Sequence, residues 1–566
     1  MAHKKNHKYI FVIGGVMSGI GKGITSASIA MLIEAKGFKV NTVKIDPYLN
    51  VDAGTMNPTE HGEVFVLDSG LETDQDMGNY ERFLGRNLSP EDYITSGMVY
   101  KHVIEKERAL EYKGKCVESL PHIPNEIIRR IDKSAFVAES DISVIEIGGT
   151  VGDYQNIMFV EAARRLHLRS REDVLFILVS YLPVPSTIGE MKTKPTQNAV
   201  HQLNSYGVQP DIIIARAPMS LDDKRKEKLA VWCTISPERV ISAPDIESIY
   251  DVPINFEKDN LSGILLEALH LKSRVKKDGF PKWRSFVNRA KSATEEVKIA
   301  VIGKYFDTGD FVLSDAYISV IEAIKHSSYA LGKKPVLTWL NAKDFEKGTQ
   351  EVATLKEFDG IIVPGGFGET GIEGKIKVIK FARENKIPYF GLCYGMQLSV
   401  VEFARHVVGL SDANTTEINP KTPHPVIDIM PEQKKHMAEG KYGATMRLGA
   451  YPCILKPGTV AFKAYTGSKS ENYKLQTTNH KLINERHRHR YEVNPEYIAQ
   501  IEKAGLVFSG TSPDGVLMEI AELPRKVHPF FLGTQFHPEF KARPLAPHPL
   551  FTEFLKASVA RSVKIR

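Results

Sequence analysis

Short, continuously apolar segments alternate with helical patterns along the chain, and this alternation constrains the possible folds most strongly. Residues 9–13 form the first such segment, and a glycine-rich turn and a predicted helix at about 25–36 follow it. Strands that are apolar at every position are typical of parallel sheets covered on both faces. Further strands are predicted at 40–45, 142–147, 174–179 and 211–214. The first half of the chain is therefore predicted to be an α/β domain.

The α/β pattern starts again at residues 297–302, after a segment rich in lysine and arginine with little periodic apolar patterning. We interpret 1–270 as one α/β domain, 271–296 as a linker with one or two helices, and 297–566 as a second α/β domain. The strands predicted in the second domain are 360–364, 388–392, 506–509, 516–521 and 530–536. Each half is long enough to bury a sizeable core.

The composition is that of an ordinary globular protein. Hydrophobic residues make up 42% and charged residues 25%, and the net charge of +6 over 566 residues is too dilute to indicate nucleic-acid binding. The four cysteines form no CxxC pair, so neither a zinc site nor a disulfide framework is indicated. No segment approaches ~18 apolar residues, and the basic N-terminus lacks the features of a signal peptide. We therefore expect a cytoplasmic protein without a membrane span.

A cysteine lies in a strand–turn–helix setting that is typical of nucleophiles. The segment Gly391-Leu-Cys393-Tyr-Gly395 follows a predicted strand and precedes a predicted helix at 396–405. The two glycines are expected to permit a sharp turn that projects the side chain of Cys393. The N-terminus of the helix favours a thiolate and offers backbone N–H groups to an oxyanion.

A candidate base for this cysteine ends the last predicted strand. In Phe536-His537-Pro538-Glu539, alternate residues of an extended segment share a face, so Glu539 is expected to orient the imidazole of His537. A buried structural cysteine or an ordinary loop histidine would explain either motif alone, but both together favour a Cys393–His537–Glu539 triad. The turn at 363–368 has glycine N–H groups that could approach an oxyanion, although alone it is a weak signal.

The first strand leads into a candidate phosphate-binding loop. The segment Gly14-Gly-Val-Met-Ser-Gly-Ile-Gly-Lys22-Gly-Ile-Thr25 is close to a P-loop, but its spacing is off by one and Gly23 occupies the usual Ser/Thr position. A plain strand–turn–helix is the alternative, although glycine N–H groups with a lysine at a helix N-terminus suit phosphate. Carboxylates elsewhere must then hold the metal, and the candidates are Asp74, Asp76 and Glu146. The donor-rich segment 192–197 is either an exposed turn or a triphosphate-binding loop.

The motifs of the second half resemble those of class I glutamine amidotransferases, which hydrolyse glutamine through a cysteinyl thioester. The matching motifs are Pro-Gly-Gly-Phe-Gly, Gly-Leu-Cys-x-Gly-Met-Gln and Gln-Phe-His-Pro-Glu. The resemblance implies that seven residues bind glutamine: Gly366, Tyr394, Gly395, Met396, Gln397, Glu417 and Arg490. Without it, the basic run 486–490 would be interpreted as a solvated face or a nucleic-acid patch.

Motifs along nearly the whole first half, joined to such a glutaminase, resemble CTP synthases. They are the loop at 14–23 and the segments 44–48, 61–65, 79–83, 146–153 and 192–197. The resemblance implies an α/β fold of two parallel-sheet domains, a P-loop-like amidoligase and a class I glutaminase. It also implies a ligase of pyrimidine nucleotide biosynthesis, in which ATP phosphorylates the 4-oxygen of UTP and ammonia from glutamine then displaces phosphate.

The same resemblance assigns nucleotide and metal contacts. ATP contacts are expected from Gly19, Ile20, Gly21, Lys22, Gly23, Ile24, Lys44, Asp76, Asp245 and Ile246. UTP or CTP contacts are expected from Ser18, Asp153, Tyr154, Gln155, Lys192, Thr193, Lys194, Pro195, Thr196, Gln197 and Lys228. Magnesium is assigned to Asp76 and Glu146, and the passage of ammonia to the region of Pro58, His61 and Val64. GTP is expected as an allosteric activator, and a homotetramer as the assembly.

Two positions depart from the family's pattern. Gln155 follows Tyr154 where the family usually has Ile-Glu, so altered product inhibition by CTP is expected. Tyr394 follows the nucleophile where leucine is common, but its N–H can still serve an oxyanion. Two other functions remain open: an amidoligase with a different acceptor, such as a carboxylate, and a nucleotide-dependent assembly protein with a relic glutaminase. The intact triad counts against the second.

Overall fold

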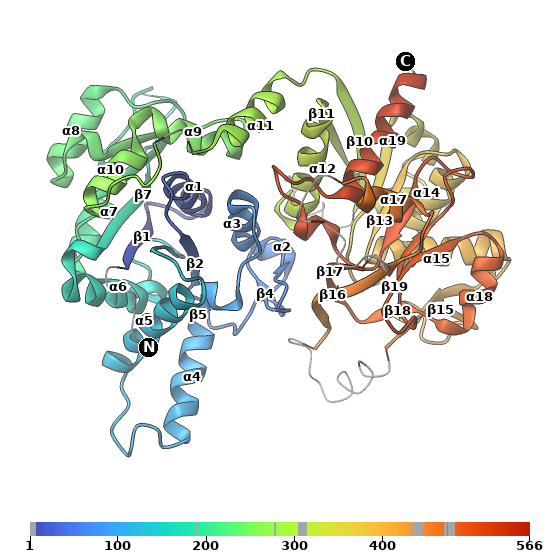
Figure 1. Cartoon of the computed structure of the whole chain (residues 1–566), viewed down its shortest axis with the longest axis horizontal. Helices are drawn as coiled ribbons and strands as arrows, with labels where there is room; N and C mark the ends of the chain where they lie inside the picture. Colours follow the sequence, from blue (N-terminus) through green and yellow to red (C-terminus); the bar gives the residue numbers. More distant parts are fainter. Residues whose placement is uncertain are drawn as a thin grey trace. The chain divides into compact units, whose positions relative to one another are not determined.

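The computed structural model describes residues 7–187, 189–276, 279–303, 314–430, 433, 445–468, 473 and 482–565. The chain forms two compact units, one of residues 1–53 and 76–287 and the other of residues 54–75 and 288–566 (Figure 1). Segment 54–75 thus belongs to the second unit, although it lies inside the first half of the sequence. Among the described residues, no helix is both long enough and apolar enough to cross a bilayer.

The first unit is built on a seven-stranded parallel sheet in the order β5-β2-β6-β1-β7-β8-β9. Its strands are β1 (Lys8–Gly15), β2 (Val40–Asp46), β5 (Tyr93–Thr95), β6 (Ile142–Ile147), β7 (Val174–Tyr181), β8 (Ile212–Ala217) and β9 (Val240–Pro244). Every residue of β1 is buried, as expected for a strand covered on both faces. The apolar pattern therefore predicted this parallel sheet correctly, although it missed the edge strands β5 and β9.

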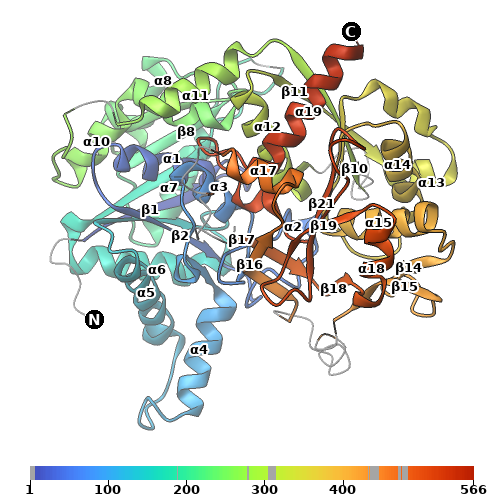
Figure 2. The same ribbon diagram turned by 45° about the vertical axis from the view of Figure 1, so that its right-hand side comes forward.

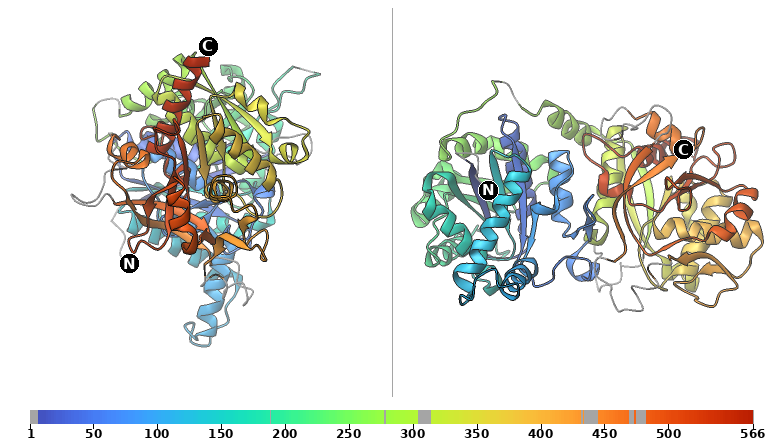
Figure 3. Two further views of the ribbon diagram at one scale, coloured as in Figure 1. Left: turned by 90° about the vertical axis from the view of Figure 1, so that its right-hand side faces the viewer. Right: turned by 60° about the horizontal axis from the view of Figure 1, so that its bottom comes forward.

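Helices cover both faces of this sheet. They are α1 (Lys22–Glu34), α3 (Asp76–Leu84), α4 (Ser96–Arg108), α5 (Ser119–Val137), α6 (Ile157–Arg169), α7 (Lys194–Ser205), α8 (Asp223–Cys233), α9 (Val252–Phe256), α10 (Leu261–Ala268) and α11 (Pro281–Ser292). Phe11, Ile127 and Phe159 belong to the core between the sheet and α4–α6, whereas α1 contacts β2 and β6 from the opposite side (Figure 2). The C-terminal part of α4 and the loop that follows it extend away from the rest of the first unit (Figure 3).

The predicted linker contains helix α11, and its aromatic face packs into the first unit. Trp283 Nε1 donates a hydrogen bond to the carbonyl oxygen of Tyr250 at 2.9 Å, and their rings meet edge to face at 5.6 Å. Phe286 and Val287 are buried beside Trp283. The expectation of little apolar patterning was therefore wrong at this helix, where Trp283, Phe286 and Val287 form one buried face.

The second unit is built on a nine-stranded mixed sheet in the order β11-β10-β12-β13-β21-β20-β19-β16-β17. Its strands are β10 (Glu296–Gly303), β11 (Lys334–Asn341), β12 (Gly360–Val363), β13 (Tyr389–Leu392), β16 (Arg447–Leu455), β17 (Leu482–His489), β19 (Val507–Thr511), β20 (Met518–Glu522) and β21 (Phe531–Thr534). The first five in spatial order are parallel, and the other four pair antiparallel. The β-rich C-terminal end is thus confirmed.

Helices and two small sheets complete the second unit. The helices are α2 (Pro58–His61), α12 (Ile318–Ala330), α13 (Ala342–Lys347), α14 (Ile372–Glu384), α15 (Tyr394–Phe403), α17 (Val460–Thr466), α18 (Pro495–Lys503) and α19 (Pro549–Ile565). The small sheets are β14 (Ala413–Thr415) with β15 (His424–Ile429) and β18 (Tyr491–Val493), and β3 (Phe65–Val66) with β4 (Glu72–Thr73). Helix α15 leads away from the end of β13 and packs on β14 and β15 (Figure 2).

Candidate active sites in the two units

Cys393 occupies a strained turn between β13 and α15. Its backbone has φ 49° and ψ −98°, and a positive φ is uncommon for a residue other than glycine. The turn is held because Cys393 N donates to the carbonyl oxygen of Thr534 at 2.6 Å, and the side chain is buried. Strain of this kind concentrates at functional sites, so the geometry agrees with the predicted nucleophile.

The glycines beside Cys393 permit the sharp turn because they leave room for neighbouring backbone. Neither Gly391 nor Gly395 has a positive φ, because Cys393 itself makes the sharp turn. A Cβ atom on Gly391 would lie 2.6 Å from the backbone of Gly395, and one on Gly395 would collide with the carbonyl oxygen of Val363. The glycines are therefore required for the close approach of the backbone at this turn, which confirms the expectation that they permit it.

His537 and Glu539 form the expected pair. Nδ1 of His537 donates to Oε1 of Glu539 at 2.7 Å. The segment is not extended as predicted, because β21 ends at Thr534 and Glu539 lies in a 3₁₀ helix, Pro538–Lys541. The tight helical turn brings the two side chains together in place of a shared strand face. The imidazole also stacks on the ring of Phe540, with centroids 5.0 Å apart.

The charge environment of His537 suits a proton carrier. Burial lowers the pKa of His537, but the attraction of Glu539 and Cys393 outweighs burial and raises this pKa to about 10. Nε2 of His537 is buried and has no hydrogen-bonding partner among the described residues. A Cβ atom on Gly365 would lie 2.9 Å from Cε1 of His537 and 3.7 Å from Cβ of Cys393. Both side chains therefore lie close to the same glycine.

These residues line a pocket inside the second unit. Cys393, His537 and Glu539 share its wall with Gly365, Gly366 and Phe367 and, from segment 54–75, with Pro58, Glu63 and Val64. Glu63 accepts a hydrogen bond from Ser319 N at 3.2 Å, which attaches this segment to α12. Glu63 and Phe367 were not predicted as site residues. The only feature of the sequence that indicates these two residues is that they lie within the motifs at 61–65 and 363–368.

Acidic residues attach the rest of segment 54–75 to β17. Asp68 forms an ion pair with the buried Arg486, and Glu72 accepts a hydrogen bond from Arg488 Nε at 2.8 Å. Arg486 and both histidines of this strand, His487 and His489, are fully or almost fully buried. The alternative of a solvated basic face or nucleic-acid patch at 486–490 was therefore wrong for these positions.

The predicted glutamine-binding residues lie in three places. Gly366 lines the pocket. Tyr394, Gly395, Met396 and Gln397 form the buried first turn of α15. Glu417 accepts a hydrogen bond from Gly368 N at 2.8 Å, beside the pocket wall. Arg490 donates through Nη1 to Gln433 at 2.6 Å and to Thr445 at 3.0 Å, and is not among the lining residues described.

In the first unit, the ammonium group of Lys44 lies close to the predicted metal ligands Asp76 and Glu146. Its Nζ lies 3.0 Å from Oε1 of Glu146, 3.6 Å from Oδ1 of Asp46, and in hydrogen-bonding contact with Asp76. Lys44 and Glu146 are register partners on β2 and β6, and Asp76 begins α3. Burial raises the pKa of Glu146 despite Lys44, whereas the pKa of Asp76 is lowered because Lys44 outweighs the effect of burial.

The same site explains why glycine follows Lys22. A Cβ atom on Gly23 would collide with Oδ1 of Asp76. The Asp76 carboxylate thus occupies the space that a Ser or Thr side chain would need in an ordinary P-loop. Lys22 starts α1, three residues earlier than predicted, and its Nζ donates to the carbonyl oxygen of Gly149 at 2.9 Å. Burial lowers the pKa of Lys22.

An arginine that was not predicted lies beside the loop and pairs with Asp245. Nη2 of Arg216 donates to Oδ1 of Asp245 at 2.7 Å, and Nη1 lies 3.4 Å from where a Cβ on Gly21 would be. Arg216 lies near the carboxyl end of β8, where ligands of parallel sheets bind. Its place at the carboxyl end of a predicted strand is the sequence feature from which Arg216 could have been predicted. Of the neighbouring predicted contacts, Ser18 and Ile246 are exposed.

The predicted pyrimidine-nucleotide residues start α7, lie on α8 or lie in loops. Thr196 accepts from Ser180 Oγ at 2.8 Å, and Lys192 pairs with Glu190 at 2.7 Å. Thr193, Lys194, Pro195 and Gln197 surround the start of α7, and Lys228 lies on α8. Asp153 accepts from Thr150 N at 2.6 Å. Tyr154 and Gln155 are exposed in a short 3₁₀ helix, Tyr154–Asn156.

Comparison with known proteins identifies the family. Residues 8–271 match the family described as CTP synthase N-terminus, and residues 312–557 match glutamine amidotransferase class-I. The CTP synthase of Thermococcus gammatolerans is 50% identical over 98% of this chain and 99% of its own length. The chain belongs to the CTP synthase family.

Other relatives agree with this assignment. The CTP synthase of Pyrococcus furiosus is 49% identical over 97% of this chain and 98% of its own length. Among solved structures, the glutaminase domain of a Trypanosoma brucei CTPS with bound acivicin is 35% identical. It covers 47% of this chain and 94% of its own, with a TM-score of 0.40.

Proposed function

We propose that this chain is a ligase that makes CTP from UTP, ATP and glutamine. In this reaction ATP phosphorylates the 4-oxygen of the uracil ring, and ammonia released from glutamine then displaces phosphate. The observation that carries the proposal is the buried Cys393–His537–Glu539 arrangement in a chain that belongs to the CTP synthase family along almost its whole length. A carbonyl oxygen is a poor leaving group, which is why its phosphorylation must precede amination.

In the glutaminase reaction, the Cys393 thiolate attacks the side-chain carbonyl of glutamine. The N-terminus of α15 and the glycines at 365–366 offer N–H groups to the resulting oxyanion. His537, protonated and held by Glu539, gives its proton to the departing ammonia. Water, deprotonated by His537, then hydrolyses the thioester and releases glutamate. Pro58 and Val64 line the pocket with Cys393, which supports the expectation that ammonia leaves past this segment.

In the first unit, Lys22 and Lys44 are proposed to hold ATP phosphates. Asp76 and Glu146 are the proposed magnesium ligands, and bound magnesium supplies charge neutralisation of the phosphates. Among the described residues, no group of three or more His, Cys, Asp or Glu is placed to hold a metal by itself. This donor set fits magnesium, because Mg²⁺ is usually held by one or two carboxylates together with substrate phosphates and water.

The remaining assignments rest on the family resemblance. Segment 192–197 and Lys228 are proposed to hold UTP, with Asp153, Tyr154 and Gln155 in contact with UTP or CTP. GTP is proposed as an activator of glutamine hydrolysis, a homotetramer as the assembly and the cytoplasm as the location. Light scattering of the purified chain with and without nucleotides tests the tetramer, and a GTP titration of glutamine hydrolysis tests activation.

The decisive experiment follows CTP absorbance with the full chain, ATP, UTP and magnesium. We expect CTP to form with either glutamine or ammonia as the nitrogen source. Cys393→Ala should abolish the glutamine-dependent reaction and leave the ammonia-dependent reaction. If no CTP forms with ammonia although glutamine is hydrolysed, the acceptor is a different molecule, as in other amidoligases. Glutamine hydrolysis that persists in Cys393→Ala would refute the assigned nucleophile.

Asp76→Asn separates the two units' activities. This substitution removes a charge from the proposed magnesium site, so the magnesium concentration needed for half-maximal CTP formation should rise. Basal glutamine hydrolysis should not change, because Asp76 lies in the other unit. Magnesium titrations that superimpose for the variant and the original chain would exclude Asp76 as a ligand.

A further inference from the structure

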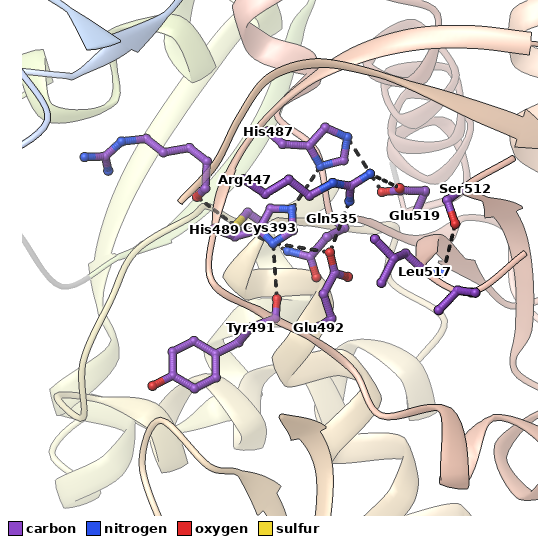
Figure 4. A network of polar contacts seen from close by, with 12 residues as sticks. Cys393, Arg447, His487, His489, Tyr491, Glu492, Ser512, Leu517, Glu519 and Gln535 are labelled. Carbon is purple, nitrogen blue, oxygen red and sulfur yellow. Dashed lines mark hydrogen bonds and ion pairs between the residues drawn. The ribbon is translucent and has the colours of Figure 1, made fainter. Parts of the chain in front are cut away.

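The side chain of Gln535 lies directly against the sulfur of Cys393. Nε2 of Gln535 lies 3.6 Å from Sγ (Figure 4). Gln535 is fully buried, and it is not among the described residues that line the pocket. It therefore reaches the sulfur from the protein interior and not from the side where glutamine is proposed to bind.

A chain of hydrogen bonds determines which end of the Gln535 amide faces the sulfur. Gln397 Nε2 donates to the carbonyl oxygen of Tyr491 at 2.9 Å, and that oxygen can only accept. The same Nε2 donates to Oε1 of Gln535 at 3.2 Å. If the Gln535 amide were flipped, two NH₂ groups would face each other. The amide nitrogen must therefore point to Cys393.

The neighbouring groups on the interior side include a carbonyl oxygen and two uncharged histidine rings. Gln535 is therefore the N–H donor that faces the sulfur from the interior side. The carbonyl oxygen of Arg488 lies 3.9 Å from Sγ and accepts from the thiol, so it favours the protonated form. Burial and the nearby Arg447 hold the pKa of both His487 and His489 well below the usual range, so these rings carry no charge at neutral pH. His537 faces Cys393 from the pocket wall.

The backbone of Gln535 pairs with a strand that carries a buried ion-pair network. Gln535 N donates to the carbonyl oxygen of Glu519 at 2.8 Å. Arg447 lies between the carboxylates of Glu519 and Glu492, with contacts of 2.7 and 3.1 Å (Figure 4). Burial raises the pKa of both carboxyl groups, against the attraction of Arg447. The Gln535 side chain itself is fully buried and held by Gln397, so it loses little further conformational freedom when it donates to the sulfur.

We propose that Gln535 is a catalytic residue of glutamine hydrolysis, which donates a hydrogen bond to the Cys393 thiolate and aligns it for attack, and that Gln397 sets the direction of this donor. The inference rests on the proposed function, in which Cys393 is the nucleophile. Hydrogen bonds to charged groups are stronger than those between neutral groups, so the donor stabilises the thiolate more than the thiol.

Two substitutions of Gln535 distinguish this role from packing. Gln535→Leu removes the donor. Gln535→Glu keeps the oxygen that accepts from Gln397 but places a second carboxylate oxygen against the sulfur. If Gln535 only supported the fold, Gln535→Glu would be the milder change. Because the carboxylate repels a thiolate, we expect it to be the more severe one.

The test measures alkylation of Cys393 by iodoacetamide against pH in the full chain, together with kcat and KM for glutamine. For Gln535→Leu, kcat and the alkylation rate at neutral pH should fall about ten- to hundred-fold, and the alkylation profile should move to higher pH. KM should stay within about two-fold, because Gln535 does not line the pocket. Ammonia-dependent CTP formation should be retained, which also shows that the variant is folded.

Ser509→Ala is a matched control, because it removes another buried hydrogen bond of the same sheet, from Ser509 Oγ to Glu522 at 2.9 Å. It should leave the alkylation profile unchanged. An unchanged kcat and profile in Gln535→Leu, or a milder effect of Gln535→Glu, would overturn the inference. Failure of the proposed function looks different, since glutamine hydrolysis by the original chain would then not depend on Cys393.

Discussion

Nδ1 of His537 donates a 2.7 Å hydrogen bond to Oε1 of Glu539, two residues further along the chain. Both residues are buried, and a 3₁₀ turn sets their distance. Glu539 therefore holds the imidazole in one tautomer and keeps it positively charged when a thiolate is present.

Glu539→Gln should reduce kcat for glutamine hydrolysis by about 10²–10⁴-fold, in line with the loss of an orienting carboxylate in other triads. The substitution also removes a charge that raises the pKa of His537 to about 10. Above this pKa His537 cannot donate a proton to ammonia, so the alkaline limb of the pH–rate profile should move to lower pH in the variant. Measured kcat/KM against pH checks this shift, and superimposed alkaline limbs would contradict it.

Gly23→Ser should reduce CTP formation with ammonia by about ten- to hundred-fold, the equivalent of ~1–3 kcal/mol of overpacking. The added Cβ collides with the Asp76 carboxylate. Initial rates at varied ATP concentration check this effect. Gly85→Asn is the control, because a Cβ there meets no atom within 4 Å and asparagine tolerates its φ of +67°. Equal rates for Gly23→Ser and the control would show that the loop tolerates a side chain beside Asp76.

Gln155→Glu should lower the CTP inhibition constant by about three- to ten-fold, since a carboxylate accepts hydrogen bonds from donor groups of a nucleotide more strongly than an amide does. Gln155 is exposed in the 3₁₀ helix at the carboxyl edge of the first sheet, so the change is not expected to disturb the fold. CTP inhibition measured against UTP provides the test. Gln500→Glu, the same change on exposed α18, is the control, and equal inhibition constants in all three proteins would exclude a contact.

Asp68→Asn should loosen segment 54–75, because it weakens the link to the buried Arg486. Burial raises the pKa of Asp68, but Arg486 and Lys541 outweigh it and lower this pKa. The stabilisation is therefore present above the ordinary pKa of aspartate and is lost as pH falls through the lowered one.

Amide hydrogen exchange of β3 and β4 in the full chain checks this prediction. Exchange should be faster in Asp68→Asn at neutral pH by about five- to hundred-fold, equivalent to ~1–3 kcal/mol. The difference between the two proteins should shrink in acid, because protonated Asp68 then resembles asparagine. Asp223→Asn, at an exposed position of α8, is the control. A difference that grew in acid would show that the charge of Asp68 is not what holds the segment.

Local sequence patterns were sufficient for the largely apolar central strands of both sheets, since burial on both faces leaves few polar residues in them. They also led to the prediction of Cys393, His537 and Glu539, because the residues of each motif lie within a few positions of one another in the elbow and at the last strand end. Edge strands were missed where polar and apolar residues mix, as in β9, β11 and β17, or where the strand is as short as the three residues of β5.

The sequence by itself determined two α/β halves, a cysteine–histidine–glutamate set and a glycine-rich loop followed by lysine. The tertiary structure alone decided which distant groups meet. It placed Asp76 against Gly23, segment 54–75 against β17, and the amide of Gln535 against Cys393. The physical reason is that close packing and buried hydrogen bonds depend on three-dimensional approach, for which neither periodicity nor motif spacing carries a signal.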